Sequence, residues 1–207
     1  MAIPALVLLV AWLLLVAGLR GYLHYRRTGE VRVPVRNEPG SPQWWARLVS
    51  SVGILFAFAA PVAELAGLAP VAVLDATPVG VVGVVGVVGV ALVALGIAGT
   101  LASQWAMGDS WRGDVDPEAR TALVTTGPFR LVRNPILTCT LTTATGLALM
   151  VPNVFAALML AAFVTALEIQ VRLVEEPYLL RVHGDDYRQY AARTGRFLPL
   201  IGRLADE

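Results

Sequence analysis

Residues 127–135 read Gly127-Pro128-Phe129-Arg130-Leu131-Val132-Arg133-Asn134-Pro135, and the rest of the chain is organised around them. This loop is polar and basic, has a proline near each end, and is flanked by long apolar runs. After the next apolar runs come Glu175-Glu176 and then a polar, aromatic segment over 184–199. We predict that the loop and this later segment meet at one face of a membrane and build a polar pocket there.

The composition is that of a membrane protein. Of 207 residues, 57% are hydrophobic and 15% charged, and the mean hydropathy is +0.67, whereas soluble domains carry about a quarter charged residues. The net charge of +1 gives no reason to expect a nucleic-acid partner. The single cysteine, Cys139, lies in an apolar run and is interpreted as a packing residue. No metal site is expected.

Apolar runs of spanning length predict an all-α polytopic fold with about five transmembrane helices. The predicted helices cover residues 3–19, 48–68, 79–103, 136–150 and 153–174. The last two form a helical hairpin around a tight turn, and both polar segments emerge at its open end. In the third helix a glycine recurs every third residue from Gly80 to Gly89, which predicts close helix packing, either within the chain or between chains.

The arginines predict the topology. The chain has no lysine, and its 16 arginines fall in three groups, over 20–47, 112–133 and 172–203. With five spans all three groups lie on one side, which the positive-inside rule makes cytoplasmic. The N-terminus is then outside, and the C-terminus is cytoplasmic. Exclusive use of arginine suggests a GC-rich genome, so we expect a bacterial inner membrane.

Four ionisable residues at the end of the fifth predicted helix share one helical face. They are Glu168, Arg172, Glu175 and Glu176. Glu168 and Arg172 are interpreted as a self-paired row that ends the span. The adjacent carboxylates of Glu175 and Glu176 need a cation nearby, and Arg130, Arg133 or a cationic ligand would supply it.

Two further patterns leave a packing role and a site role open. Thr138, Thr142 and Thr145 form a stripe on the fourth helix, interpreted as packing, although Thr138 and Thr142 lie nearest the loop and would also suit a substrate lining. Beyond residue 184, a short helix is predicted that ends at Gly195. Tyr187 and Tyr190 share one face of it. The apolar residues 197–201 would rest on the membrane surface, so this segment is either an anchor or part of a site.

The loop, the hairpin, Glu175-Glu176 and the aromatic segment together resemble the isoprenylcysteine carboxyl methyltransferase family, a relative of the phospholipid N-methyltransferases. The resemblance covers roughly residues 95–200. It implies an integral membrane methyltransferase that uses S-adenosylmethionine. The loop and the C-terminal segment would close over the cofactor at the cytoplasmic face, and a lipophilic acceptor would enter from the bilayer. Residues 79–207 would be the catalytic core, and residues 1–78 an N-terminal pair of helices with a basic loop.

The resemblance assigns roles by position. Cofactor contacts would come from Gly127, Pro128, Arg130, Arg133, Asn134, Glu175, Glu176 and Tyr187. The catalytic residues would be Arg133, Asn134 and Glu176, and the substrate-binding residues would be Thr138, Thr142 and Arg172. Asn134 replaces the usual histidine, and Leu137 stands where tyrosine is common. An amide can donate and accept hydrogen bonds, but it cannot act as a base at neutral pH.

The acceptor class stays open between a lipophilic small molecule, a lipid and an isoprenylcysteine-like carboxylate. Two other functions also stay open. One is a membrane reductase that uses NADPH and is related to sterol reductases, although a phosphate-rich cofactor fits poorly beside Glu175-Glu176. The other is a non-catalytic membrane protein whose arginine loops are attracted to anionic lipid.

Overall fold

A computed structural model describes residues 1–18, 21–22, 25–26, 38–68, 79–107 and 122–204. Within these residues the fold is all-helical, apart from isolated β-bridges. The α-helices are α1 (Ala2–Leu13), α3 (Pro42–Leu65), α4 (Val79–Met107), α5 (Pro135–Met150), α6 (Val154–Ile169) and α7 (Glu176–Arg193). Short elements of other helical types are the π-helical η1 (Leu14–Gly18) and η4 (Gln170–Glu175) and the 3-10 turn η3 (Gly127–Arg130). The predicted fold class is confirmed.

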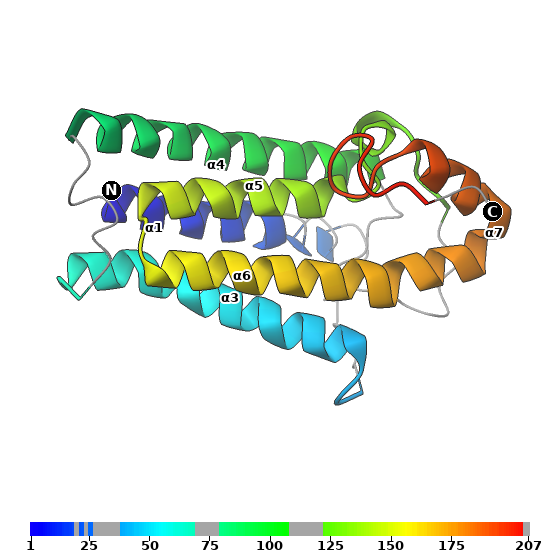
Figure 1. Cartoon of the computed structure of the whole chain (residues 1–207), viewed down its shortest axis with the longest axis horizontal. Coiled ribbons are helices and arrows are strands. Elements are labelled where there is room, and N and C mark those ends of the chain that lie inside the picture. The colour runs from blue at the N-terminus through cyan, green and yellow to red at the C-terminus, as the bar shows by residue number, and fades with distance from the viewer. Residues whose placement is uncertain (19–20, 23–24, 27–37, 69–78, 108–121, 205–207) are drawn as a thin grey trace.

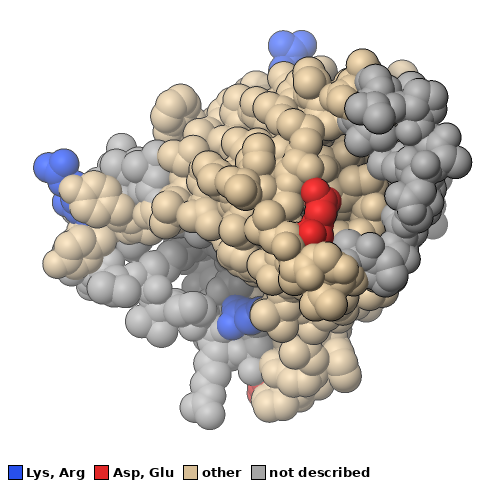
Figure 2. Space-filling model, turned by 90° about the vertical axis from the view of Figure 1, so that its left-hand side faces the viewer, with Lys and Arg blue, Asp and Glu red and all other residues tan. Residues whose placement is uncertain are grey.

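Among the described residues, three helices are long and apolar enough to cross a membrane, namely Pro42–Leu65, Gly83–Met107 and Val154–Arg193. Two shorter apolar helices, Ala2–Val16 and Pro135–Met150, accompany them. The helices run side by side along the long axis, and α7, η3 and the C-terminal segment gather at one end (Figure 1). Seen from the opposite end, the described surface is mostly uncharged, with a small acidic patch and a few separate basic side chains (Figure 2).

Which end faces the cytoplasm stays a prediction. Part of the first two arginine groups falls in 27–37 and 108–121, outside the described residues. The proposed domain boundary after residue 78 also lies outside them. The helix α3, which precedes that boundary, packs extensively along α6, which follows it.

Gly89, Gly96 and Gly99 of α4 pack within the chain, against α5. A Cβ added at Gly89 would lie 2.6 Å from the carbonyl oxygen of Gly146, and one added at Gly146 would lie 2.8 Å from the Val93 nitrogen. A Cβ at Gly96 would overlap the hydroxyl of Thr143, which is fully buried. Because small residues allow helices to approach closely in lipid, these positions bring the two backbones into contact.

Three predicted helix boundaries are wrong. The third helix continues beyond residue 103 to Met107. The second helix begins at Pro42 rather than near Leu48, because the Ser41 hydroxyl accepts a hydrogen bond from the Trp44 nitrogen at 3.2 Å and proline suits the first helical position. The fifth helix does not end near Val174. It continues through η4 into α7 and departs from helical geometry only at Gly184, whose φ is 52°.

Candidate functional site

The loop and the C-terminal segment meet, as predicted, and they pair through their backbones. Val132 and Gly195 form a parallel bridge. The Arg133 nitrogen donates to the Gly195 carbonyl at 2.8 Å, and the Asn134 nitrogen donates to that of Arg196 at 3.2 Å. A Cβ at Gly195 would overlap the carbonyl of Leu198, so this approach requires glycine.

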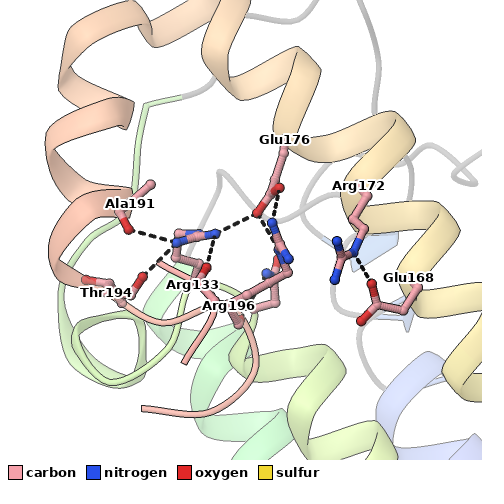
Figure 3. A network of polar contacts seen from close by, with 9 residues as sticks. Arg133, Glu168, Arg172, Glu176, Ala191, Thr194 and Arg196 are labelled. Carbon is pink, nitrogen blue, oxygen red and sulfur yellow. Dashed lines mark hydrogen bonds and ion pairs between the residues drawn. The ribbon is translucent and has the colours of Figure 1, made fainter. Parts of the chain in front are cut away.

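A buried carboxylate joins the two segments. Glu176, at the start of α7, accepts a hydrogen bond from Arg133 Nη2 at 2.7 Å. Its two oxygens also accept from Arg196 Nε and Nη2, at 2.8 and 2.9 Å. The side chains of Arg133 and Glu176 are 1% and 9% exposed. Figure 3 shows both arginines directed at this carboxylate. We call Arg133, Glu176 and Arg196 the Arg–Glu–Arg cluster.

Arg133 also holds the end of α7. Its Nη1 donates to the carbonyl oxygens of Ala191 and Thr194, at 2.9 and 2.7 Å, and its Nη2 donates to that of Gly202 at 3.0 Å. The last carbonyls of a helix have no intrahelical partner, and a guanidinium there also suits the helix dipole. Within the described chain, the buried Nε of Arg133 has no hydrogen-bond partner.

Two guanidiniums share one carboxylate, so the cluster as a unit carries a net positive charge. The hydrogen bonds with Glu176 raise the pKa of the Arg196 guanidinium, and they outweigh the opposite effect of burial. The nearby carboxylate of Glu168 raises it further. The site therefore favours an anionic group, because a second carboxylate would balance the charge.

The neighbouring carboxylates of Glu175 and Glu176 have different partners. Glu175 ends η4 and accepts a hydrogen bond from the side chain of Gln170 at 3.1 Å. π-helical turns are rare and frequently occur at functional sites. Of the two cations predicted to balance the carboxylates, Arg133 does so for Glu176, whereas Arg130 is exposed.

Glu168 and Arg172 form the predicted ion pair with each other, one helical turn apart. Both side chains are exposed at least in part, and the pair lies beside the Arg–Glu–Arg cluster (Figure 3). The predicted substrate-binding role of Arg172 stays a prediction.

Side chains at the start of α5 hold the C-terminal segment. The Asn134 amide donates to the Arg196 carbonyl oxygen at 3.1 Å. The Thr138 hydroxyl lies 2.9 Å from the carbonyl oxygen of Phe197. Thr142 lies one turn further on and donates to Thr138 within its own helix, at 2.9 Å. The structure thus brings Asn134 and Thr138 to the site through contacts with the C-terminal backbone.

The tyrosines of α7 hold the loop from the other side. Tyr190 donates its hydroxyl to the Phe129 carbonyl at 2.7 Å. Tyr187 is buried and packs edge-on against Tyr190, with ring centroids 6.2 Å apart. Gly127 is exposed and Pro128 half-buried, so the predicted cofactor residues differ widely in exposure.

Arg196 is the site residue that sequence reasoning did not assign. It lies 20 residues after its partner, beyond the break at Gly184, and no local periodicity relates the two. Arg196 is one of the residues of the aromatic segment that carry the resemblance, but no role was assigned to it. Within the described residues, no three His, Cys, Asp or Glu side chains are grouped as metal ligands would be.

We expect Asn134→Ala to lower the free energy of unfolding by only about 1 kcal/mol, because it removes one half-buried hydrogen bond. Denaturation of the purified protein in detergent measures this. Unchanged stability together with a complete loss of ligand binding would contradict a purely positioning role and make Asn134 a direct ligand.

Comparison with known proteins finds a family match over the part of the chain that contains the loop and Glu176. Residues 84–186 match the family model described as phospholipid methyltransferase. An 88-residue stretch is 32% identical to the nickel-cobalt-cadmium resistance protein NccN of Alcaligenes xylosoxydans xylosoxydans. That alignment spans 42% of this chain and 40% of the relative's length. The family match includes the loop and Glu176 but ends before Arg196.

Proposed function

Because the chain belongs, over residues 84–186, to the phospholipid methyltransferase family of membrane proteins, we propose that it transfers methyl groups from S-adenosylmethionine to a lipophilic acceptor. The observation that carries the proposal is the Arg–Glu–Arg cluster. It joins the loop and the C-terminal segment at one end of a group of apolar helices. An amphiphilic acceptor dissolved in the bilayer would reach this end without leaving the lipid.

The residues present fit this cofactor. Its carboxylate suits the net positive cluster, where the buried Nε of Arg133 lacks a partner within the described chain. Its ammonium or ribose hydroxyls suit the carboxylate of Glu175, which accepts one hydrogen bond from Gln170. When bound, the cofactor supplies a methyl group on a sulfonium. The carboxylate of Glu175 would also favour this cation.

The contacts of the cluster favour positioning over acid–base chemistry. Glu176 is held by two guanidiniums, which makes it a poor proton acceptor, and Asn134 cannot act as a base. Methyl transfer is an in-line displacement that depends mainly on orientation. An ionised carboxylate or thiolate acceptor would need no base. With an amine acceptor, Glu175 would be the base, since its side chain has no cationic partner among the described residues.

The first test is ligand-dependent stability. S-adenosylhomocysteine at about a hundred times its dissociation constant should stabilise the detergent-purified protein by roughly 2.7 kcal/mol, which thermal unfolding would show. Glu175→Gln and Arg130→Gln should reduce this shift without altering the unliganded melting temperature. Asp186→Asn, an exposed change on α7, should leave the shift intact.

A second arm tests chemistry. Membranes containing the protein and S-adenosylmethionine with a radiolabelled methyl group should transfer label to the lipid extract, and the Glu175→Gln variant should do so more slowly. A stability shift with NADPH and none with S-adenosylhomocysteine would contradict the proposal and favour a reductase.

A further inference from the structure

Residues 198–201 form a tight apolar turn at the candidate site. Leu198, Leu200 and Ile201 are 54%, 68% and 62% exposed. The turn is closed by its own backbone, because the Ile201 nitrogen donates to the Leu198 carbonyl at 3.1 Å and the Arg196 nitrogen donates to that of Ile201 at 2.8 Å. A turn whose backbone groups are paired in this way can enter an apolar environment at lower cost.

The turn is fastened on both sides by site residues. Before it, the carbonyls of Arg196 and Phe197 contact Asn134 and Thr138. After it, the Gly202 carbonyl accepts from Arg133. Leu200 has a φ of 69°, a left-handed conformation that a bulky residue keeps only where the surrounding structure imposes it. The fold therefore holds these apolar side chains outward.

The position of the turn matches a membrane interface. The contact between Phe197 and Thr138 places it beside the first turn of α5. At the same end, the last turn of α4 carries an exposed tryptophan, Trp105, and Ala106 contacts Gly127 of the loop. Figure 1 shows the C-terminal segment next to the ends of both helices. Tryptophan favours the headgroup level, and an exposed arginine, Arg203, follows the turn.

We propose that residues 198–201 dock into the bilayer, with Leu198, Leu200 and Ile201 at the boundary between headgroups and acyl chains. A lipid occupant fits better than a protein, because a stable protein interface buries about 800 Å² per partner, far more than one turn offers. Docking would hold the C-terminal segment, and with it Arg196, against the loop. This inference stands independently of the proposed methyl transfer.

The test uses one fluorescent label per molecule. Cys139, the single native cysteine, is replaced by alanine, and Leu200→Cys carries an environment-sensitive nitrobenzoxadiazole dye. Asp186→Cys, at an exposed polar position of α7, is the matched control. Both proteins are reconstituted into vesicles of phosphatidylcholine and phosphatidylglycerol, and Leu198→Cys serves as a second probe should the first variant misfold.

The label at position 200 should lose most of its fluorescence to lipids with nitroxide-bearing acyl chains and little to aqueous iodide. The label at position 186 should show the reverse. Equal iodide quenching at both positions would place the turn in water and overturn the proposal. Protection of position 200 from both quenchers would also overturn it, because protein would then cover the turn.

Discussion

Glu176→Ala is expected to detach the C-terminal segment from the loop and to cost about 3–5 kcal/mol of stability, as removal of one partner of a buried ion pair typically does. The substitution leaves Arg133 and Arg196 facing each other without the carboxylate that now accepts hydrogen bonds from both. Repulsion between the two guanidiniums adds to the loss of these bonds.

Two measurements separate local from global effects. Denaturant titration in detergent gives the change in the free energy of unfolding. Hydrogen exchange should quicken over residues 194–204 and stay slow in the middle of α5. The matched control is Glu168→Ala, which breaks an exposed pair within one helix and should cost no more than about 1 kcal/mol. Equal effects of the two substitutions would contradict a structural role for the Arg–Glu–Arg cluster.

Gly89→Ala is expected to destabilise the protein by about 1–3 kcal/mol, the usual cost of overpacking. The added methyl group would lie 2.6 Å from the Gly146 carbonyl oxygen and 2.8 Å from Met150 Cγ. The nearer of these atoms belongs to backbone, so α4 and α5 must move apart to relieve the overlap.

Gly83→Ala on the same helix is the control, because no packing atom of the described residues lies within 4 Å of its added Cβ. Helix propensity alone favours alanine over glycine by up to about 1 kcal/mol, so this variant should be neutral or more stable. Comparing the two melting temperatures in one detergent isolates the contact. A Gly89→Ala protein as stable as Gly83→Ala would show that the two helices do not pack this closely.

Hydropathy made the helices predictable, because each apolar run must be removed from water whatever it packs against. The recurrent glycines of α4 likewise indicated close packing, although only the structure shows that Gly89 meets α5 and Gly86 meets Met1. The start of α3 was missed because residues 42–47 precede the apolar run from which the helix was predicted. The capping hydroxyl of Ser41 extends the helix to include them.

The candidate site was predictable in part. The need for a cation beside Glu175-Glu176 pointed to Arg130, Arg133 or a cationic ligand, of which Arg133 pairs with Glu176. The resemblance brought the loop to the aromatic segment. The role of Arg196 and the carbonyls that hold Arg133 depend on contacts between residues distant in sequence. The π-helical turn before Glu176 was equally hidden, because it changes the direction of side chains without a signal in residue type.

The backbone contact between Gly89 and Gly146 also limits how the protein can move. Two helices that touch through their main chains cannot slide past each other without a clash, so α4 and α5 are held fixed relative to each other. The loop that ends at Pro135 continues directly into α5. Gly184, with its positive φ and open surroundings, is the natural hinge. Opening the site would therefore require the chain after Gly184 to break the hydrogen bonds of the Arg–Glu–Arg cluster, while the helices in the membrane stay still.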